Sequence, residues 1–141
     1  MAEYFLAKRD DDAGELISNL KIQKLVYYAQ GVYLALFNEP LFPESIEAWT
    51  HGPVVPDLYH EYKGYGDKAI DPPTGIDFKK YNKRTREVLD EVYAVFGQFS
   101  AWKLRQMTHK ESPWKETMDS GGGVITHQLL HEHFDTIVTH E

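Results

Sequence analysis

The sequence predicts a mainly α-helical protein, a compact helical domain around one long central helix with a minor short β ribbon. The longest periodic segment, residues 19–37, repeats apolar side chains at the spacing of an α-helix. The segments 82–100, 101–109 and 127–138 repeat this pattern over shorter stretches. Residues 46–50 instead alternate between apolar and polar side chains, which indicates one short strand. Helices that pack around the longest of them therefore account for most of the chain.

The length and composition of the chain fit one domain. The 141 residues are 42% hydrophobic and 26% charged, close to the averages for globular proteins. A domain of this size buries roughly 70% of the surface that its unfolded chain would expose. We therefore expect a single domain over residues 1–141, with its core between about residues 15 and 138.

A short helix over residues 2–9 is the first predicted element, and a polar connection that stops at Gly14 follows it. The long helix over residues 19–37 comes next. Ser18 is a suitable N-cap for it, because its hydroxyl can accept a hydrogen bond from a free helix amide. Gly31 lies inside this helix and costs it about 1 kcal/mol relative to alanine. A glycine at this place predicts that another element approaches the helix closely.

The segment after the long helix changes direction twice. Asn38 and Pro40 end the helix, and the predicted strand follows. Residues 41–42 or a later segment could pair with this strand to form the ribbon. Pro56 then suits the first position of a new helix, which we expect over residues 56–63. The stretch WTHGPVVPDLY, residues 49–59, is therefore a rigid corner between a strand and a helix.

The next part of the chain is a loop followed by two helices. The loop covers residues 67–78 and is rich in proline, glycine and aspartate. The helix over residues 82–100 follows, and Ser100 caps the helix over 101–109. The apolar side of the first of these helices is predicted to consist of Val88, Leu89, Val92, Val95, Phe96 and Phe99.

The last part of the chain is predicted to begin with a tight turn at residues 112–114, Ser-Pro-Trp. A mobile glycine run at residues 121–123 comes after it. Residues 124–125 can add a strand residue or two. Thr126 then caps the final helix, which extends to about residue 138 with apolar side chains at helical spacing.

Charge and residue usage exclude several classes of protein. The net charge is −7, so the chain lacks the excess of positive charge that non-specific nucleic-acid binding needs. A basic run at residues 79–86 is interpreted as the solvated start of a helix. The absence of cysteine excludes disulfides and thiolate metal sites. We see no signal peptide and no apolar stretch long enough for a membrane helix, so we expect a cytoplasmic protein.

Histidines and carboxylates provide the few candidates for catalysis. His127 and His131 lie four residues apart on a predicted helix, as in a zinc protease motif, but glutamine replaces the catalytic glutamate between them. His51, His60 and His109 could act as acid–base groups, and Glu44 and Glu47 could form a hydrolytic pair. None of these residues has an identifiable catalytic partner. We therefore assign no catalytic residue, metal or cofactor, and a small hydrolase or metal enzyme stays as an alternative.

Aromatic residues are the stronger signal, because tryptophan and tyrosine are enriched at the energetic centres of protein interfaces. Packing in the core is the favoured interpretation for Trp49 and Trp102, whereas Tyr62 and Tyr65 are better candidates for exposure. The full set of candidate aromatic anchors is Trp49, Tyr59, Tyr62, Tyr65, Trp102 and Trp114.

Three motifs, in order, carry a resemblance to a known family. They are NLKIQKLVYYAQGVYLALFNEPLF, EAWTHGPVVPDLYHEYKGYG and MTHKESPWKET, followed by VITHQLLHEHF. The set resembles the Panacea domain family, which includes SocA-like antitoxins and phage-associated GepA-like proteins. The resemblance covers about residues 15–135. The family's signature positions correspond here to Gln23, Lys24, Leu25, Tyr28, Gln30, Gly31, Trp49, Gly52, Pro53, Val54, Pro56, Tyr59, His109, Pro113 and Trp114.

The resemblance implies an antitoxin that neutralises a cognate protein toxin by direct contact. One branch of the family also implies an alternative, a proteolytic adaptor that delivers its toxin to an ATP-dependent protease. Residue 51 is histidine here, where tyrosine is common in the family, and the chain has no room for the N-terminal DNA-binding domain of some members. The sequence leaves open whether the chain forms a homodimer. The residues predicted to bind the partner are Trp49, His51, Pro53, Val54, Pro56, Tyr59, Tyr62, His109 and Trp114.

Overall fold

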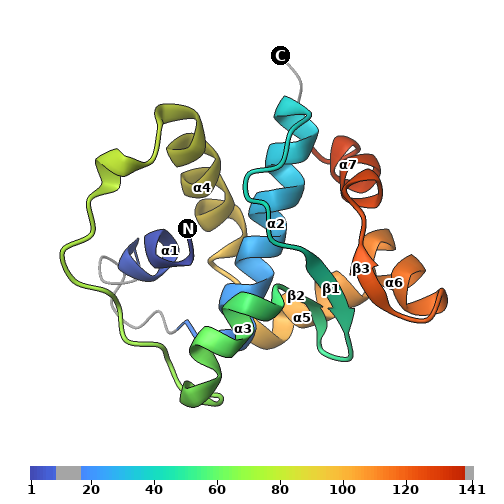
Figure 1. Cartoon of the computed structure of the whole chain (residues 1–141), viewed down its shortest axis with the longest axis horizontal. Helices are drawn as coiled ribbons and strands as arrows, with labels where there is room; N and C mark the ends of the chain where they lie inside the picture. The colour runs from blue at the N-terminus through green and yellow to red at the C-terminus, as the bar shows by residue number, and fades with distance from the viewer. Residues whose placement is uncertain (9–16, 139–141) are drawn as a thin grey trace.

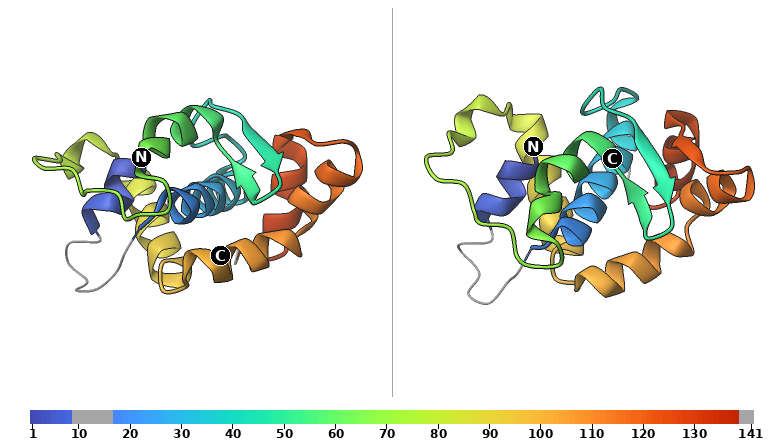
Figure 2. Two further views of the ribbon diagram at one scale, coloured as in Figure 1. Left: turned by 90° about the horizontal axis from the view of Figure 1, so that it is seen from below. Right: turned by 60° about the horizontal axis from the view of Figure 1, so that its bottom comes forward.

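A computed structural model of the chain describes residues 1–8 and 17–138, and its fold is mainly α-helical with one small sheet. The predicted stop at Gly14 lies outside the described residues. Helix α2 (Asn19–Phe37) runs through the centre, and Figures 1 and 2 show α1 and α4 on one side of it and α6 and α7 on the other. The remaining helices are α1 (Ala2–Lys8), α3 (Pro56–Tyr62), α4 (Lys83–Phe96), α5 (Ala101–His109), α6 (Ser112–Asp119) and α7 (His127–Asp135).

The ends of α2 form as the sequence predicts. The hydroxyl of Ser18 accepts a hydrogen bond from the amide of Lys21. At the other end Asn38 adopts a left-handed backbone conformation, with φ of 57°, and its amide donates to the carbonyl of Leu34. Nearly the whole helix is buried, including several polar side chains, because neighbours cover it on every side. The central position predicted for this helix is therefore confirmed.

The close approach predicted at Gly31 is also present. A Cβ atom at this position would overlap the ring of Phe134 on α7. Phe134 is fully buried, and it makes edge-to-face contacts with Tyr27 and Tyr28 of α2 at centroid distances of 5.5 and 5.8 Å. The absence of a side chain at Gly31 thus lets α7 pack directly against the central helix.

The ribbon has three strands rather than two. Strand β1 (Ile46–Trp49) lies in the middle, between β2 (Gly52–Val54) and β3 (Gly123–Ile125), and both pairings are antiparallel. The partner of β1 is therefore not residues 41–42. Gly52 allows the tight turn into β2, since its φ is 114° and a Cβ there would press against the Lys24 side chain and the Thr108 hydroxyl.

Three local predictions differ from the structure. The predicted tight turn at residues 112–114 is instead the start of α6, because Pro113 suits the first turn of a helix, where its missing N–H leaves no bond unmade. Of the predicted mobile glycine run at 121–123, Gly123 belongs to β3 and pairs with Ala48. Val95, predicted for the apolar side of α4, is 41% exposed, and Tyr93 is buried on that helix.

Buried polar side chains of α2 bind the backbone of the segment that follows it. The side-chain oxygen of Gln30 accepts a hydrogen bond from the N–H of Leu41, and its side-chain NH₂ donates to the carbonyl of Phe42. Gln23 accepts from the N–H of Val55 at 2.9 Å. Lys24 donates to the carbonyl of Pro53 at 3.1 Å. These bonds satisfy groups that would otherwise be buried without partners, and they fix the corner against the central helix.

Several side chains of the basic run at residues 79–86 form ion pairs with carboxylates of this chain. Lys80 pairs with Glu3, and Arg84 pairs with Glu39 and donates to the Tyr33 hydroxyl. Lys83 lies 3.8 Å from Glu87, one turn further along α4. The predicted interpretation of this run as a solvated helix start fits these exposed pairs. In the part of the chain that the structure describes, no helix is long and apolar enough to cross a membrane.

Candidate partner-binding face

The turn between β1 and β2 is held by two side chains from the far half of the sequence. Trp114 of α6 donates its indole N–H to the carbonyl of Trp49 at 2.7 Å. The Nε2 atom of His109, at the end of α5, lies 2.9 Å from the carbonyl oxygen of Thr50. The His109 and Trp114 rings contact each other, with centroids 3.9 Å apart. The structure therefore brings His109 and Trp114, both among the residues predicted to bind the partner, to the corner.

A cavity opens beside this turn, between the N-terminal half of α2, the ribbon, α3 and α5, and we call it the corner cavity. Its volume is about 450 Å³. Trp49 and Tyr59 meet edge to face at 5.0 Å and form one wall. His51 and Val54 also line it. Four of the predicted partner-binding residues therefore surround one cavity.

The other predicted site residues have different positions. Pro53 is buried within β2, and Pro56 starts α3. Tyr62 does not line the corner cavity: it is half-buried at the end of α3, with its ring 6.5 Å from that of Tyr65. Both tyrosines pack against the hydrophobic core, so their predicted exposure is only partial.

Several residues that line this cavity were not among those predicted to bind the partner, and three of them matter most for its chemistry. Trp102 was predicted to pack in the core, but it is 59% exposed and lines the cavity from α5. The helical period could have shown this, because Trp102 lies two positions before the buried Leu104 and so points to the opposite side of the helix. Arg105 and Lys24 also line the cavity. Lys24 carried a signal only as a signature position of the family.

Two of the cations that line the cavity, Lys24 and Arg105, are close enough for the charge of one to act on the other. Burial, and then the positive charge of Arg105, lower the pKa of Lys24 to about 7, and its side chain is fully buried. The guanidinium of Arg105 lies 4.7 Å from the ring centroid of Trp102. The Nε atom of Arg105 is buried and has no hydrogen-bond partner. The floor of the cavity is thus cationic, although the whole chain carries a net charge of −7.

The partly buried carboxyl group of Glu111 lies between α2 and the start of α6. Glu111 precedes α6, and its two carboxyl oxygens accept hydrogen bonds from Tyr27 and Tyr28 at 2.9 and 2.8 Å. Burial raises the pKa of Glu111 to about 7, against the opposite effect of the two hydroxyl donors. Ionisation of Glu111 is therefore less favourable in the folded protein than in the unfolded chain.

This arrangement predicts a pH-dependent stability that Glu111→Gln removes. The folded pKa is raised above the ordinary value of 4.5, so the unfolding free energy should fall as the pH rises from 4.5 to about 7. Glutamine has no charge to bury, so Glu111→Gln should be more stable than the wild type near pH 7.5, by on the order of 1–3 kcal/mol. Urea unfolding between pH 4.5 and 7.5 measures how steeply the unfolding free energy changes with pH in the wild type and in Glu111→Gln. Glu116→Gln, an exposed change on α6, is the control, and equal slopes in wild type and Glu111→Gln would contradict the prediction.

The candidates for metal binding and hydrolysis are not assembled into a site. His131 faces Asn38, with 2.7 Å between its Nε2 atom and the amide oxygen. Glu47 accepts from the indole N–H of Trp49 at 2.9 Å. Within residues 1–8 and 17–138 no group of three or more histidine, aspartate or glutamate side chains is placed to hold a metal ion. The structure thus gives these residues local structural partners.

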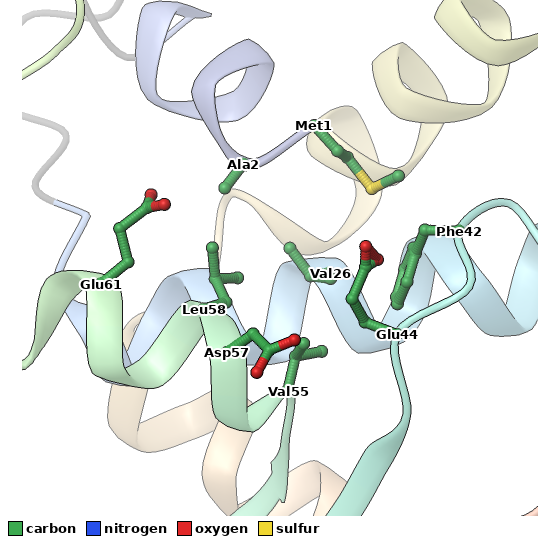
Figure 3. Close-up of a pocket in the computed structure, with 9 residues that line it drawn as sticks. All are labelled: Met1, Ala2, Val26, Phe42, Glu44, Val55, Asp57, Leu58 and Glu61. Atoms are coloured by element: carbon green, nitrogen blue, oxygen red, sulfur yellow. The ribbon is translucent and has the colours of Figure 1, made fainter.

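A second hollow, of about 310 Å³, lies on the other side of α3 (Figure 3). Val26 and Leu58 form part of its apolar lining, and the carboxylates of Glu44, Asp57 and Glu61 stand around it. Glu44 thus lines this hollow, whereas the Glu47 carboxylate accepts the indole N–H of Trp49. This acidic hollow differs in charge from the corner cavity, which contains Lys24 and Arg105.

The corner lies within the part of the chain that matches a known protein family. The family described as "Antitoxin SocA-like, Panacea domain" matches residues 22–115, which include the ribbon turn, α5 and Trp114. The curated protein Antitoxin SocA of Caulobacter vibrioides (strain NA1000 / CB15N) is 32% identical over 109 residues. That match covers 70% of this chain and 58% of the relative, so the chain spans little more than half of the relative's length. No solved structure matches the chain.

Proposed function

The chain belongs to the SocA-like Panacea domain family of antitoxins, and from this we propose that it neutralises a cognate protein toxin by binding it directly at the corner. The observation that carries the proposal is the set of aromatic and imidazole side chains gathered around the ribbon turn. Trp49, His51 and Tyr59 line an open cavity, and His109 and Trp114 hold the backbone that presents them. The family similarity supports an antitoxin role, and the stiff aromatic face supports a contact surface rather than a catalytic centre.

The rigidity of the corner is suited to binding. On one side, Gln23 and Lys24 of α2 bond to the backbone of Val55 and Pro53. On the other side, Trp114 of α6 bonds to the carbonyl of Trp49 at the end of β1. A face that is already ordered loses little conformational entropy when a partner covers it. We therefore infer that the toxin meets a preformed surface in the cytoplasm.

Co-expression tests this proposal. The product of the neighbouring gene should stop growth when it is expressed alone, and this chain should restore growth and co-purify with it. His51→Glu, at the exposed tip of the turn, should weaken rescue, whereas His127→Glu, exposed on α7, should not. Because both changes add the same charge, a difference between them reports the corner itself. Absence of both rescue and co-purification would contradict the proposal.

The same experiment separates direct neutralisation from the adaptor alternative. An adaptor needs a second surface for the protease, and it removes the toxin instead of covering it. Toxin levels should therefore stay constant during rescue if direct binding is sufficient. Rescue that occurs only while an ATP-dependent protease is active, with loss of the toxin, would favour the adaptor.

A further inference from the structure

Two cations of the corner cavity lack an acidic partner. Neither Lys24 nor Arg105 forms an ion pair with any of the residues that the structure describes. Lys24 is fully buried, and its ammonium group makes one hydrogen bond, to the Pro53 carbonyl. The buried Nε atom of Arg105 makes none. Buried polar and charged groups are normally paired, so an anion in the cavity would supply the missing partner of the Arg105 Nε–H and favour the charged form of Lys24.

We propose that the corner cavity receives a carboxylate group carried by a peptide segment of the protein partner. The identity of the partner rests on the proposed function, whereas the anion site rests on the cavity alone. The carboxylate lies against Arg105 and Lys24, and the aromatic wall of Trp49, Tyr59 and Trp102 packs on its apolar stem. Charge-assisted hydrogen bonds of this kind are stronger than neutral ones.

The geometry favours a carboxylate on a short stem. The guanidinium of Arg105 lies over the ring of Trp102, and its planar set of N–H donors suits a carboxylate. The cavity volume of about 450 Å³ accommodates one side chain of a partner but not a folded element. The charged residues that line it are Lys24, Lys63 and Arg105 on the positive side and Asp67 on the negative side, so its local charge opposes that of the chain.

The anion site can be tested on the isolated chain with a matched pair of probes. The probes are 3-phenylpropionate and its neutral amide, 3-phenylpropionamide, and the readout is the indole N–H signal of each tryptophan in NMR spectra. The carboxylate should shift the signals of Trp49 and Trp102 and leave that of Trp114 nearly unchanged, and the amide should shift none at the same concentration. Equal responses to the two probes, or to inorganic phosphate, would overturn the proposal.

Variants of α5 complete the test. Arg105→Gln should weaken binding of 3-phenylpropionate at least about tenfold, because a charge-assisted contact is lost, whereas Lys103→Gln on the same helix should not. The same pair is then compared for affinity to the toxin, with melting temperatures as a control for folding. Full affinity of Arg105→Gln, without a carboxylate-specific shift in the wild type, overturns the anion site and leaves the antitoxin proposal standing. A specific shift in a chain that fails to neutralise the toxin supports the anion site and contradicts the antitoxin proposal alone.

Discussion

Replacing Gly31 with leucine should destabilise the protein strongly and lower its melting temperature. The leucine Cβ alone would overlap the ring of Phe134, and the rest of the side chain has no space between α2 and α7. Phe134 cannot move away easily, because it is fully buried between Tyr27 and Tyr28. Overpacking a well-filled core costs about 1–3 kcal/mol or more, and separating the two helices exposes further apolar surface. That loss is a large part of a typical stability of roughly 5–15 kcal/mol.

Thermal unfolding followed by circular dichroism measures this effect. Gly64→Leu is the matched control, since nothing lies within 4 Å of a Cβ at that exposed position. A second pair of variants keeps the test informative if Gly31→Leu cannot be purified. Gly31→Ala should destabilise the protein, and the added change Phe134→Leu should cost less in that background than in the wild type. Strict additivity of the two changes, or a normal melting temperature for Gly31→Leu, would contradict the close packing.

Features that depend on neighbouring residues could be predicted from the sequence. Ser18, Ser100 and Thr126 each accept a hydrogen bond from the amide three residues ahead, as expected for N-caps. Asn38 ends α2 and Pro56 begins α3 for equally local reasons. These signals are readable because cap geometry involves atoms within one helical turn.

Features that depend on distant residues could not be predicted in detail. Strand β3 pairs with β1 across more than 70 residues, and three residues of high glycine and apolar content give no periodic signal of their own. The corner cavity combines Lys24 of α2 with Arg105 of α5, and only the packing of those helices brings them together. Thr108 and the Gly52 turn meet for the same reason. The resemblance to a family identified many of the corner positions, but it did not show which of them are exposed.

Trp102→Ala should produce the largest loss of toxin binding that leaves the fold intact. The ring is 59% exposed, so its removal should change the unfolding free energy by less than about 0.5 kcal/mol. If the corner cavity is the centre of the contact, the same change removes an aromatic anchor and its stacking on Arg105. Loss of such an anchor typically costs about 2 kcal/mol or more of binding, which is roughly a thirtyfold or greater fall in affinity.

Trp114→Ala provides the contrasting result, because that side chain supports the turn from behind. It donates to the Trp49 carbonyl and packs on His109, so its loss should lower the melting temperature as well as toxin affinity. Val95→Ala, which shortens an exposed apolar side chain on α4, should change neither quantity. Calorimetric titration with the toxin and thermal unfolding together separate the three variants. A lowered melting temperature for Trp102→Ala with unchanged affinity would mean that this tryptophan stabilises α5, and the toxin would then have to bind elsewhere.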